Sequence, residues 1–247
     1  SSRSVRPSGP AGLAWRPPRA RLPIVGSHDE GPPEEEMATV KRVHLVRHGR
    51  TASNVVHRTM GWSDEGIVPA WRAAAEAVAE ALAGEPIDHL VSSPLARAVQ
   101  TAEPLARRLG RDPVLDERFG ELRVGPWQGY TEDEIAERWP DEWRVWRTAP
   151  HTLVMEGRET LKELNARVAE ALDELFDSLA EGRAAVVFTH DAVVRAGVAW
   201  ALGTGPEIYR HVRVANCSIT TVALVGDRRE LVRSNSTGHL AHLALDE

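Results

Sequence analysis

The sequence contains a single cysteine, Cys217, among its 247 residues. One thiol cannot form a disulfide within the chain, so the fold does not need an oxidising compartment, and we expect a cytoplasmic protein. Long hydrophobic runs are also lacking, because no uninterrupted apolar stretch approaches the about 20 residues that a membrane-spanning helix needs. We therefore expect no membrane partner.

Positive charge is in deficit. The chain has 30 Lys and Arg residues against 36 Asp and Glu residues, and its formal net charge is −6 at pH 7. This balance argues against broad nucleic-acid binding, so we expect no nucleic-acid partner. It does not exclude a small anionic substrate, because a few arginines in a cleft set the local field. No group of Asp and Glu residues has the spacing of metal ligands.

The N-terminal stretch has little apolar periodicity. It is rich in Pro, Ser, Gly and Arg and ends in the run Pro32–Glu36. Such a composition cannot bury enough surface to offset the entropy of ordering it. We therefore predict a disordered tail over residues 1–38 and a single domain over residues 39–247. A targeting peptide is the weaker alternative, because prolines interrupt an amphipathic helix here.

Apolar runs and helical periodicity alternate through the rest of the chain. Predicted strands occupy residues 42–47, 87–91, 113–115, 184–188, 218–225 and 229–234, and predicted helices occupy residues 70–83, 94–109, 131–147 (broken at Pro140), 158–179 and 192–202. This order predicts an α/β fold: a three-layer sandwich with a mostly parallel central sheet, helices on both faces and a C-terminal hairpin. In such sheets, ligands bind beyond the carboxyl ends of the strands.

An Arg-His pair stands where the first predicted strand ends. Arg47 and His48 follow a buried apolar run and precede Gly49, Thr51 and Asn54, in the pattern R-H-G-x-T-x-x-N. Arginine binds phosphate oxygens through a planar fork, and histidine can attack phosphorus. The alternative is a histidine that merely ends a strand, and the full string argues against this alternative. His190 follows the strand at 184–188 in the same way, so both histidines are expected to meet in one pocket.

Several further motifs occur in a fixed order after this string. They are Met60–Asp64, Ser92–Ala102, Phe119–Leu122 with Gly125–Gly129, Val186–His190, Asn216–Ile219 and Gly238–Leu240. Together with residues 42–48, these stretches resemble the histidine phosphatase superfamily, which also holds the cofactor-dependent phosphoglycerate mutases. The resemblance extends from about residue 41 to the C-terminus and favours the phosphatase branch.

The resemblance implies a role for each motif residue. His48 is the expected nucleophile, forming a phosphohistidine that water then hydrolyses. Arg47 and Arg97 are expected to bind the phosphate oxygens, and His190 is expected to donate to one of them. The resemblance implies neither a metal nor another cofactor, because the two arginines and His190 neutralise the charge of the phosphate. No group of carboxylates with metal-ligand spacing contradicts this expectation. A solvent-exposed helix arginine is the alternative for Arg97, and a structural histidine is the alternative for His190.

Proton transfer is expected from Glu121, which would protonate the leaving alkoxide and then accept a proton from water. Glu117 is a nearby rival, and an ordinary loop glutamate is the alternative for both. Asn54 and Thr51 are expected to complete the contacts to phosphate oxygens. Four tryptophans are expected at the rim of the pocket, with core packing as the alternative for each: Trp127, Trp139, Trp143 and Trp146.

Three positions depart from the family pattern: Asp191, Arg158 and Trp71, the last of which stands where a glycine is common. Asp191 follows the second histidine, where the family usually has glycine, and we predict that it caps the helix beginning at Ala192 and faces away from the phosphate. The alternative is that Asp191 tunes His190 or excludes doubly phosphorylated ligands. Arg158 stands in the stretch that usually reads Gly-Gly-Glu-Ser, where it could reach a substrate or only a surface carboxylate.

These features predict a metal-independent phosphomonoesterase that hydrolyses a small-metabolite phosphate. The short segment between Glu121 and His190 favours hydrolysis, because mutases tend to carry a longer insertion that encloses the intermediate. A phosphoglycerate-mutase-type phosphotransferase is the alternative within the enzyme class, and a non-catalytic binding protein of the same fold is a more remote one. The identity of the substrate is not readable from the sequence, and a homodimer through the sheet edge is left open.

Overall fold

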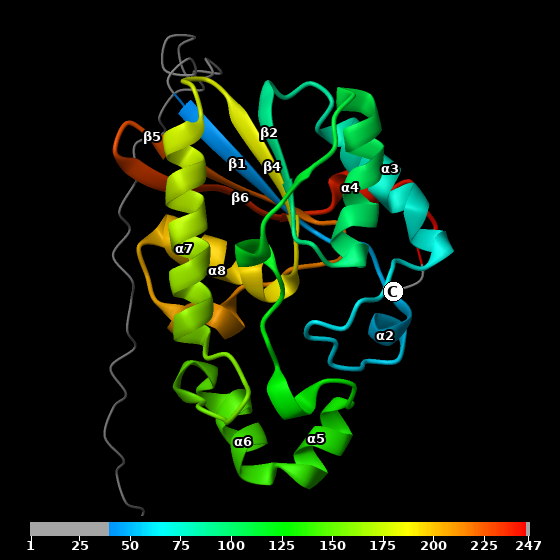
Figure 1. The fold of residues 1–247 in the computed structure, drawn as a ribbon, viewed down its shortest axis with the longest axis vertical. Helices are drawn as coiled ribbons and strands as arrows, with labels where there is room; N and C mark the ends of the chain where they lie inside the picture. Colours follow the sequence, from blue (N-terminus) through cyan, green and yellow to red (C-terminus); the bar gives the residue numbers. More distant parts are fainter. Residues whose placement is uncertain (1–39, 246–247) are drawn as a thin grey trace, which may run out of the picture. The chain divides into compact units, whose positions relative to one another are not determined.

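The computed structural model describes residues 40–245, so the tail predicted over residues 1–38 lies outside the described residues. The fold is the predicted α/β sandwich, built on a six-stranded sheet with strand order β3-β2-β4-β1-β5-β6 (Figure 1). The strands are β1 (Val40–Arg47), β2 (Ile87–Ser92), β3 (Val114–Leu115), β4 (Ala184–Thr189), β5 (Ile219–Val225) and β6 (Arg228–Ser236).

The sheet is mostly parallel. β1, β2, β3 and β4 pair in parallel, whereas β5 pairs antiparallel with both β1 and β6. β5 and β6 form the predicted C-terminal hairpin around Gly226, whose φ of 58° is the left-handed conformation that glycine adopts without strain. β1 and β4 are neighbours at the centre of the sheet, and Arg47 at the end of β1 is in register with Thr189 at the end of β4.

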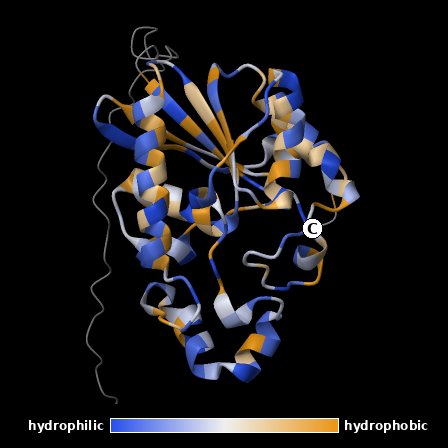
Figure 2. Cartoon of the chain, viewed as in Figure 1, coloured by the Kyte–Doolittle hydropathy of each residue, from blue (hydrophilic) through white to orange (hydrophobic). Residues whose placement is uncertain are grey.

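Helices cover both faces of the sheet because the central strands are apolar on both sides. Side chains alternate along β1, so Leu45 joins one buried core and Val46 the other. The first core contains residues of α7 (Leu161–Ser178) and α8 (Asp191–Leu202), and the second contains residues of α3 (Arg72–Ala81) and α4 (Ala96–Leu109). Figure 2 shows the apolar central strands between helices of mixed polarity.

Smaller helices lie beyond the carboxyl ends of the central strands. These are α2 (Ala52–Val55), α5 (Glu132–Arg138) and α6 (Pro140–Thr148), the last two separated at the predicted proline break (Figure 1). The 3-10 helices are η1 (Pro69–Trp71), η2 (Glu117–Phe119), η3 (Gly125–Trp127), η4 (Pro150–Thr152), η5 (Pro206–His211) and η6 (Gly238–Leu240). Across residues 40–245, no helix is long and apolar enough to cross a membrane.

Two predicted helix starts are wrong by a few residues. The helix predicted from Pro94 begins at Ala96, and the helix predicted from Arg158 begins at Leu161. In the second case Thr160 is the N-cap: its hydroxyl accepts from the Glu163 N–H, and the Glu163 carboxylate accepts from the Thr160 N–H. This capping box sets the start of the helix three residues after Arg158, which therefore lies in the preceding turn.

Candidate active site

His48 and His190 come together because each is the first residue after one of two paired parallel strands. His48 follows β1 and His190 follows β4, and the His48 N–H donates to the Thr189 carbonyl at 2.9 Å. Their ring centroids are 5.2 Å apart and the ring planes are inclined by 59°. Both side chains are buried. The convergence of the two histidines at the carboxyl end of the sheet is thus as the strand pattern predicts.

The hydrogen bond of His48 fixes its tautomer. The ring Nδ1 lies 2.7 Å from the Gly49 carbonyl, which can only accept, so Nδ1 carries the proton and Nε2 carries the lone pair. Burial, and then the positive charges of Arg97 and Arg47, hold the pKa of His48 well below its usual value. The imidazole is therefore neutral at neutral pH, with Nε2 able to act as a nucleophile.

Arg97 lies in the first turn of α4 with its guanidinium completely buried. Its Nη1 and Nη2 donate to the Ser63 and Gly61 carbonyls at 2.7 and 2.8 Å, and its Nε donates to His190 Nδ1 at 3.3 Å. These bonds use three of the five N–H groups of a guanidinium, so two remain for the oxygens of an anion. The exposed helix arginine considered above is wrong for this position.

Arg47 supplies a second positive charge to the same place. Its Nη1 donates to the Val214 carbonyl at 2.6 Å and lies 3.8 Å from the Asp191 carboxylate. Its Nε is buried without a hydrogen-bond partner among the described residues. A buried N–H without an acceptor is costly, and an anion in the cavity would relieve that cost.

Both ring nitrogens of His190 have partners. Nδ1 accepts from Arg97, so Nε2 carries the proton and donates to the Ser93 hydroxyl at 2.7 Å. Burial, and then the nearby positive charges, hold the pKa of His190 well below its usual value. Donation from His190 to a phosphate therefore requires Nδ1 to gain a proton and Arg97 Nε to turn toward the anion. A bound phosphate dianion favours both changes, because it raises the pKa of the imidazole.

Glu121 lies in the same cavity, and its Oε1 accepts from the Leu122 N–H at 2.8 Å. Burial, and then the charge of Asp191, raise the pKa of this carboxyl, although Arg97 and Arg47 act in the opposite direction. A raised pKa suits a group that must deliver a proton near neutral pH. Glu117 is exposed and is not among the cavity residues, so the geometry favours Glu121 over its rival.

Asn54 and Thr51 differ in their access to the cavity. Asn54 lines it, and its side-chain oxygen accepts from Asn216 Nδ2 at 3.4 Å. Thr51 is buried behind it as the N-cap of α2, where its hydroxyl accepts from the Asn54 N–H. A direct contact between Thr51 and a phosphate oxygen stays a prediction, and the capping bond gives Thr51 a clear role in holding Asn54.

The cavity has a volume of about 180 Å³, which suits a small ligand. Three of the predicted rim tryptophans line it, namely Trp127, Trp143 and Trp146, whereas Trp139 packs against Tyr130 with ring centroids 5.5 Å apart. A larger groove of about 700 Å³ adjoins it through Arg47, Asn54 and Arg58, and neither His48 nor His190 lines that groove. His48 lines the smaller cavity, whereas His190 is not among its lining residues. Within residues 40–245, no three His, Cys, Asp or Glu side chains converge as metal ligands would.

Several cavity residues have no role assigned from the sequence, among them Tyr209 and Met60. Tyr209, on η5, lines the cavity and contacts Trp146 with ring centroids 5.4 Å apart. Met60 also lines it and accepts a hydrogen bond from Thr51 Oγ1 at its sulfur, 3.2 Å away. Met60 belongs to one of the motifs quoted above, so a signal for it was present, whereas no motif pointed to Tyr209.

The predicted helix cap at Asp191 is wrong. Asp191 is itself the first residue of α8, His190 is the N-cap, and no side chain caps this helix. The Asp191 carboxylate instead binds Arg195 one turn later, at 2.7 Å and 3.2 Å, and faces Arg47. Arg195 in turn donates to the Tyr209 and Val212 carbonyls. Asp191 therefore places a negative charge beside the cavity, where it acts on Glu121.

Replacing Asp191 with asparagine should shift the pH dependence of phosphate-ester hydrolysis. Removing the negative charge lowers the pKa of Glu121, so the carboxyl loses its proton at lower pH and the alkaline limb of kcat/KM moves to lower pH. Asparagine keeps the size of the side chain and one oxygen acceptor for Arg195. Asp141→Asn, at an exposed residue of α6, is the matched control and should leave the limb in place. If the alkaline limb of kcat/KM does not move in Asp191→Asn, the charge of Asp191 does not raise the pKa of Glu121.

Comparison with known proteins adds an independent observation to this geometry. The family model described as histidine phosphatase superfamily (branch 1) matches residues 43–237. A 2-carboxy-D-arabinitol-1-phosphatase from Triticum aestivum is 30% identical over 192 residues, which are 77% of this chain and 38% of that protein. The match thus spans less than half of the wheat protein.

A second relative matches over most of its length, and a solved structure matches over nearly its whole length. A probable phosphoglycerate mutase GpmB from Enterobacter sp. is 32% identical over 185 residues, covering 73% of this chain and 84% of the relative. The structure of a mycobacterial glucosyl-3-phosphoglycerate phosphatase in complex with VO3 superimposes with a TM-score of 0.73 at 30% identity. It covers 79% of this chain and 99% of that one.

Proposed function

The chain belongs to the histidine phosphatase superfamily, and from this premise we propose that it is a metal-independent phosphomonoesterase acting on a small phosphorylated metabolite. The reaction would proceed through a phosphohistidine on His48. The observation that carries the proposal is the neutral His48, with its lone pair on Nε2, in one small cavity with Arg47, Arg97 and Glu121.

In the first step, His48 Nε2 attacks phosphorus. The N–P bond forms while the ester P–O bond breaks, and the leaving oxygen takes the proton of Glu121. Arg47 and Arg97 balance the charge of the phosphoryl oxygens. His190 joins them once its Nδ1 takes a proton from solvent, and it returns that proton when phosphate leaves. The Glu121 carboxylate is left ionised and ready to act as a base.

In the second step, water attacks the phosphohistidine. Glu121 accepts a proton from the water, the O–P bond forms and the N–P bond breaks, which releases phosphate and restores neutral His48. Two displacements on one histidine replace one difficult displacement by water. Each residue returns to its starting protonation state, so the cycle needs no further reactant.

A phosphoglycerate-mutase-type phosphotransferase is the second candidate, favoured by the 32% identity to a probable phosphoglycerate mutase. The phosphatase names of other relatives and the short segment between Glu121 and His190 favour hydrolysis. In hydrolysis, water accepts the phosphoryl group. In the mutase reaction, a second hydroxyl of the substrate would accept it.

Phosphate release from a panel of metabolite phosphates distinguishes these two candidates. We expect the purified chain to release phosphate from p-nitrophenyl phosphate and from at least one metabolite, at a rate that EDTA does not change. With 3-phosphoglycerate and its 2,3-bisphosphate, formation of the 2-phospho isomer without free phosphate would instead identify a mutase. Activity that EDTA abolishes would contradict metal independence.

A further inference from the structure

Arg158 lies on the wall of the cavity that holds His48, in the turn before α7. The residue is 8% exposed. The guanidinium carbon is 4.7 Å from the ring centroid of Trp127 and 4.4 Å from that of Trp146, so the cation packs against two indole rings. The surface carboxylate considered as its partner in the sequence analysis is therefore wrong.

The turn that carries Arg158 is fixed on both sides. The Arg158 N–H donates to the Met155 carbonyl at 3.1 Å, and the next residue, Glu159, donates its own N–H to the Arg123 carbonyl at 2.8 Å. The Glu159 carboxylate binds Arg167 rather than Arg158. The side chain of Arg158 is thus directed by a rigid segment, while the carboxylate beside it in sequence is already occupied.

Two buried donors in this wall have no hydrogen-bond partner among the described residues. They are Nη1 of Arg158 and the indole Nε1 of Trp127. An unpartnered buried donor, and above all a buried charge, is costly unless an acceptor is provided. Burial lowers the pKa of Arg158 to about 10, which still leaves it protonated at neutral pH. Two residues that line the cavity therefore hold a positive charge and an N–H group that lack an acceptor among the described residues.

We propose that Arg158 binds a carboxylate of the substrate, so that the enzyme acts on phosphate esters of small carboxylic acids. This assignment rests on the proposed phosphomonoesterase function, since His48 and Arg158 line one cavity. The phosphoryl group would lie at His48, Arg47 and Arg97. The carboxylate would accept from Arg158 Nη1, with Trp127 Nε1 as a second donor.

The surroundings of Arg158 favour a carboxylate over the other groups that a tryptophan-lined wall could bind. A nucleobase or sugar would stack on an indole face, but the guanidinium already lies against Trp127 and Trp146. A second phosphate group would carry roughly two negative charges at neutral pH. Arg158 offers one positive charge, and the carboxyl groups of Glu121 and Glu132 line the same cavity. A single carboxylate matches the charge that is available.

Two pairs of substrates test this assignment, because the members of each pair differ at the carboxylate. Phosphoserine is compared with phosphoethanolamine, and 3-phosphoglycerate with glycerol 3-phosphate. We expect kcat/KM to be at least about 30-fold higher for the carboxylate-bearing member of at least one pair, as a charge-assisted hydrogen bond would give. Equal kcat/KM within both pairs would overturn the proposal.

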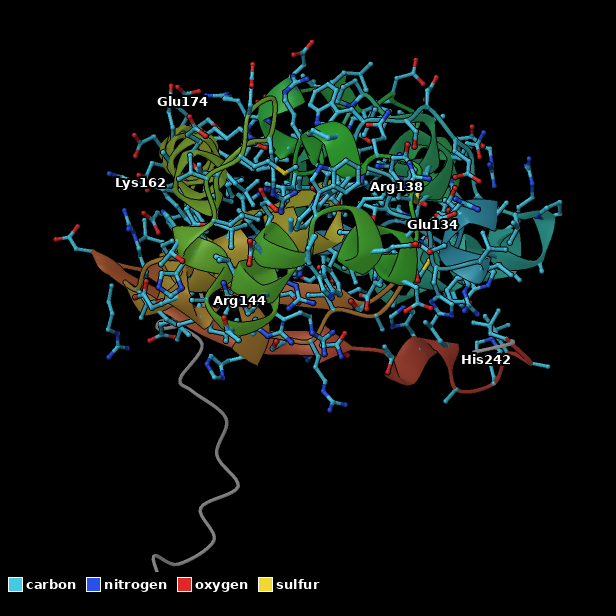
Figure 3. All side chains as sticks on the ribbon, turned by 90° about the horizontal axis from the view of Figure 1, so that it is seen from below. Glu134, Arg138, Arg144, Lys162, Glu174 and His242 are labelled. Atoms are coloured by element: carbon cyan, nitrogen blue, oxygen red, sulfur yellow. The ribbon has the colours of Figure 1, made fainter. Side chains whose placement is uncertain are left out.

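Variants of Arg158 then assign the preference to this residue. In Arg158→Met the ratio within the preferred pair should fall to about 1, mainly through a higher KM for the carboxylate, and Arg158→Lys should give an intermediate ratio because it keeps only the charge. Arg144→Met replaces an exposed arginine on α6 (Figure 3) and should keep the wild-type ratio. If Arg158→Met lowers kcat/KM equally for both members of a pair, Arg158 has a structural role and the assignment is overturned.

Further readouts separate this proposal from the proposed function. If no phosphate ester is hydrolysed, the phosphomonoesterase function fails, and calorimetric binding of the same pairs still shows whether carboxylate-bearing ligands bind more tightly. If a thermal melt shows that Arg158→Met is unfolded, the kcat/KM ratios of the wild type and of Arg158→Lys test the assignment instead. A lower ratio in Arg158→Lys than in the wild type would support it, and equal ratios would overturn it. The wild type could also prefer fructose 1,6-bisphosphate over fructose 6-phosphate, and Arg158→Met could remove that preference. This result would show that Arg158 binds a second phosphate and would contradict the assignment.

Discussion

Replacing His48 with alanine is expected to lower kcat for p-nitrophenyl phosphate by at least about 10³-fold, because the proposed mechanism has no other nucleophile. The lone pair on His48 Nε2 is available because Gly49 accepts the Nδ1 proton and because the pKa of His48 is held low. Alanine leaves the phosphate-binding arginines in place, so KM should change much less than kcat. Steady-state release of nitrophenol measures both constants.

The matched control for this prediction is His242→Ala. His242 is an exposed histidine near the C-terminus and is not among the cavity residues (Figure 3). Its replacement should leave kcat within about twofold of the wild type, as for most surface substitutions. Turnover by His48→Ala at the wild-type rate would exclude His48 as the nucleophile, whatever the control shows.

Replacing Arg97 with lysine should lower kcat/KM by at least about 100-fold, because a buried donor to the transferring phosphoryl group is worth about this much. Lysine keeps the positive charge but loses the planar fork that binds Gly61, Ser63 and His190 together. The loop at residues 61–63 would lose its anchor, and the two remaining N–H groups that face the anion would be gone. Kinetics with p-nitrophenyl phosphate measure the effect.

A second arginine on the same helix provides the control. Arg107 lies about three turns further along α4, where it is exposed and pairs with Glu76. The control variant is Arg107→Lys. This pair is solvent-exposed, so the change should alter kcat/KM by less than about twofold and the stability by a few tenths of a kcal/mol. If both substitutions had the same small effect, Arg97 would not bind the phosphoryl group.

The central part of the site could be predicted from the sequence because it depends on strand ends. The apolar run before His48 and the one before His190 predict two buried strands, and the carboxyl ends of neighbouring parallel strands meet at one edge of a sheet. The structure pairs these strands directly, which brings the rings within 5.2 Å. Arg97 follows from the same logic, since its helix begins where the next strand in the sheet, β2, ends.

The remaining parts of the site depend on helix starts and side-chain partners, which periodicity does not determine. A difference of one residue at the start of α8 changes Asp191 from a cap into a partner of Arg195 and a neighbour of Glu121. A difference of three residues before α7 moves Arg158 into a turn on the cavity wall. The Thr160–Glu163 capping box was a readable signal for that helix start. No local pattern indicates that Trp127 and Trp146 lie against Arg158.

The central claim is that phosphorus becomes bonded to His48 during the reaction. The most direct measurement is to quench the enzyme with a phosphate ester within the first turnover and to locate the phosphoryl group by peptide mass spectrometry under alkaline conditions, which preserve phosphohistidine. The account predicts phosphorylation on the peptide that contains His48, and none on that peptide in His48→Ala. Phosphorylation on His190 or another residue, or turnover by His48→Ala without any phosphoenzyme, would contradict it.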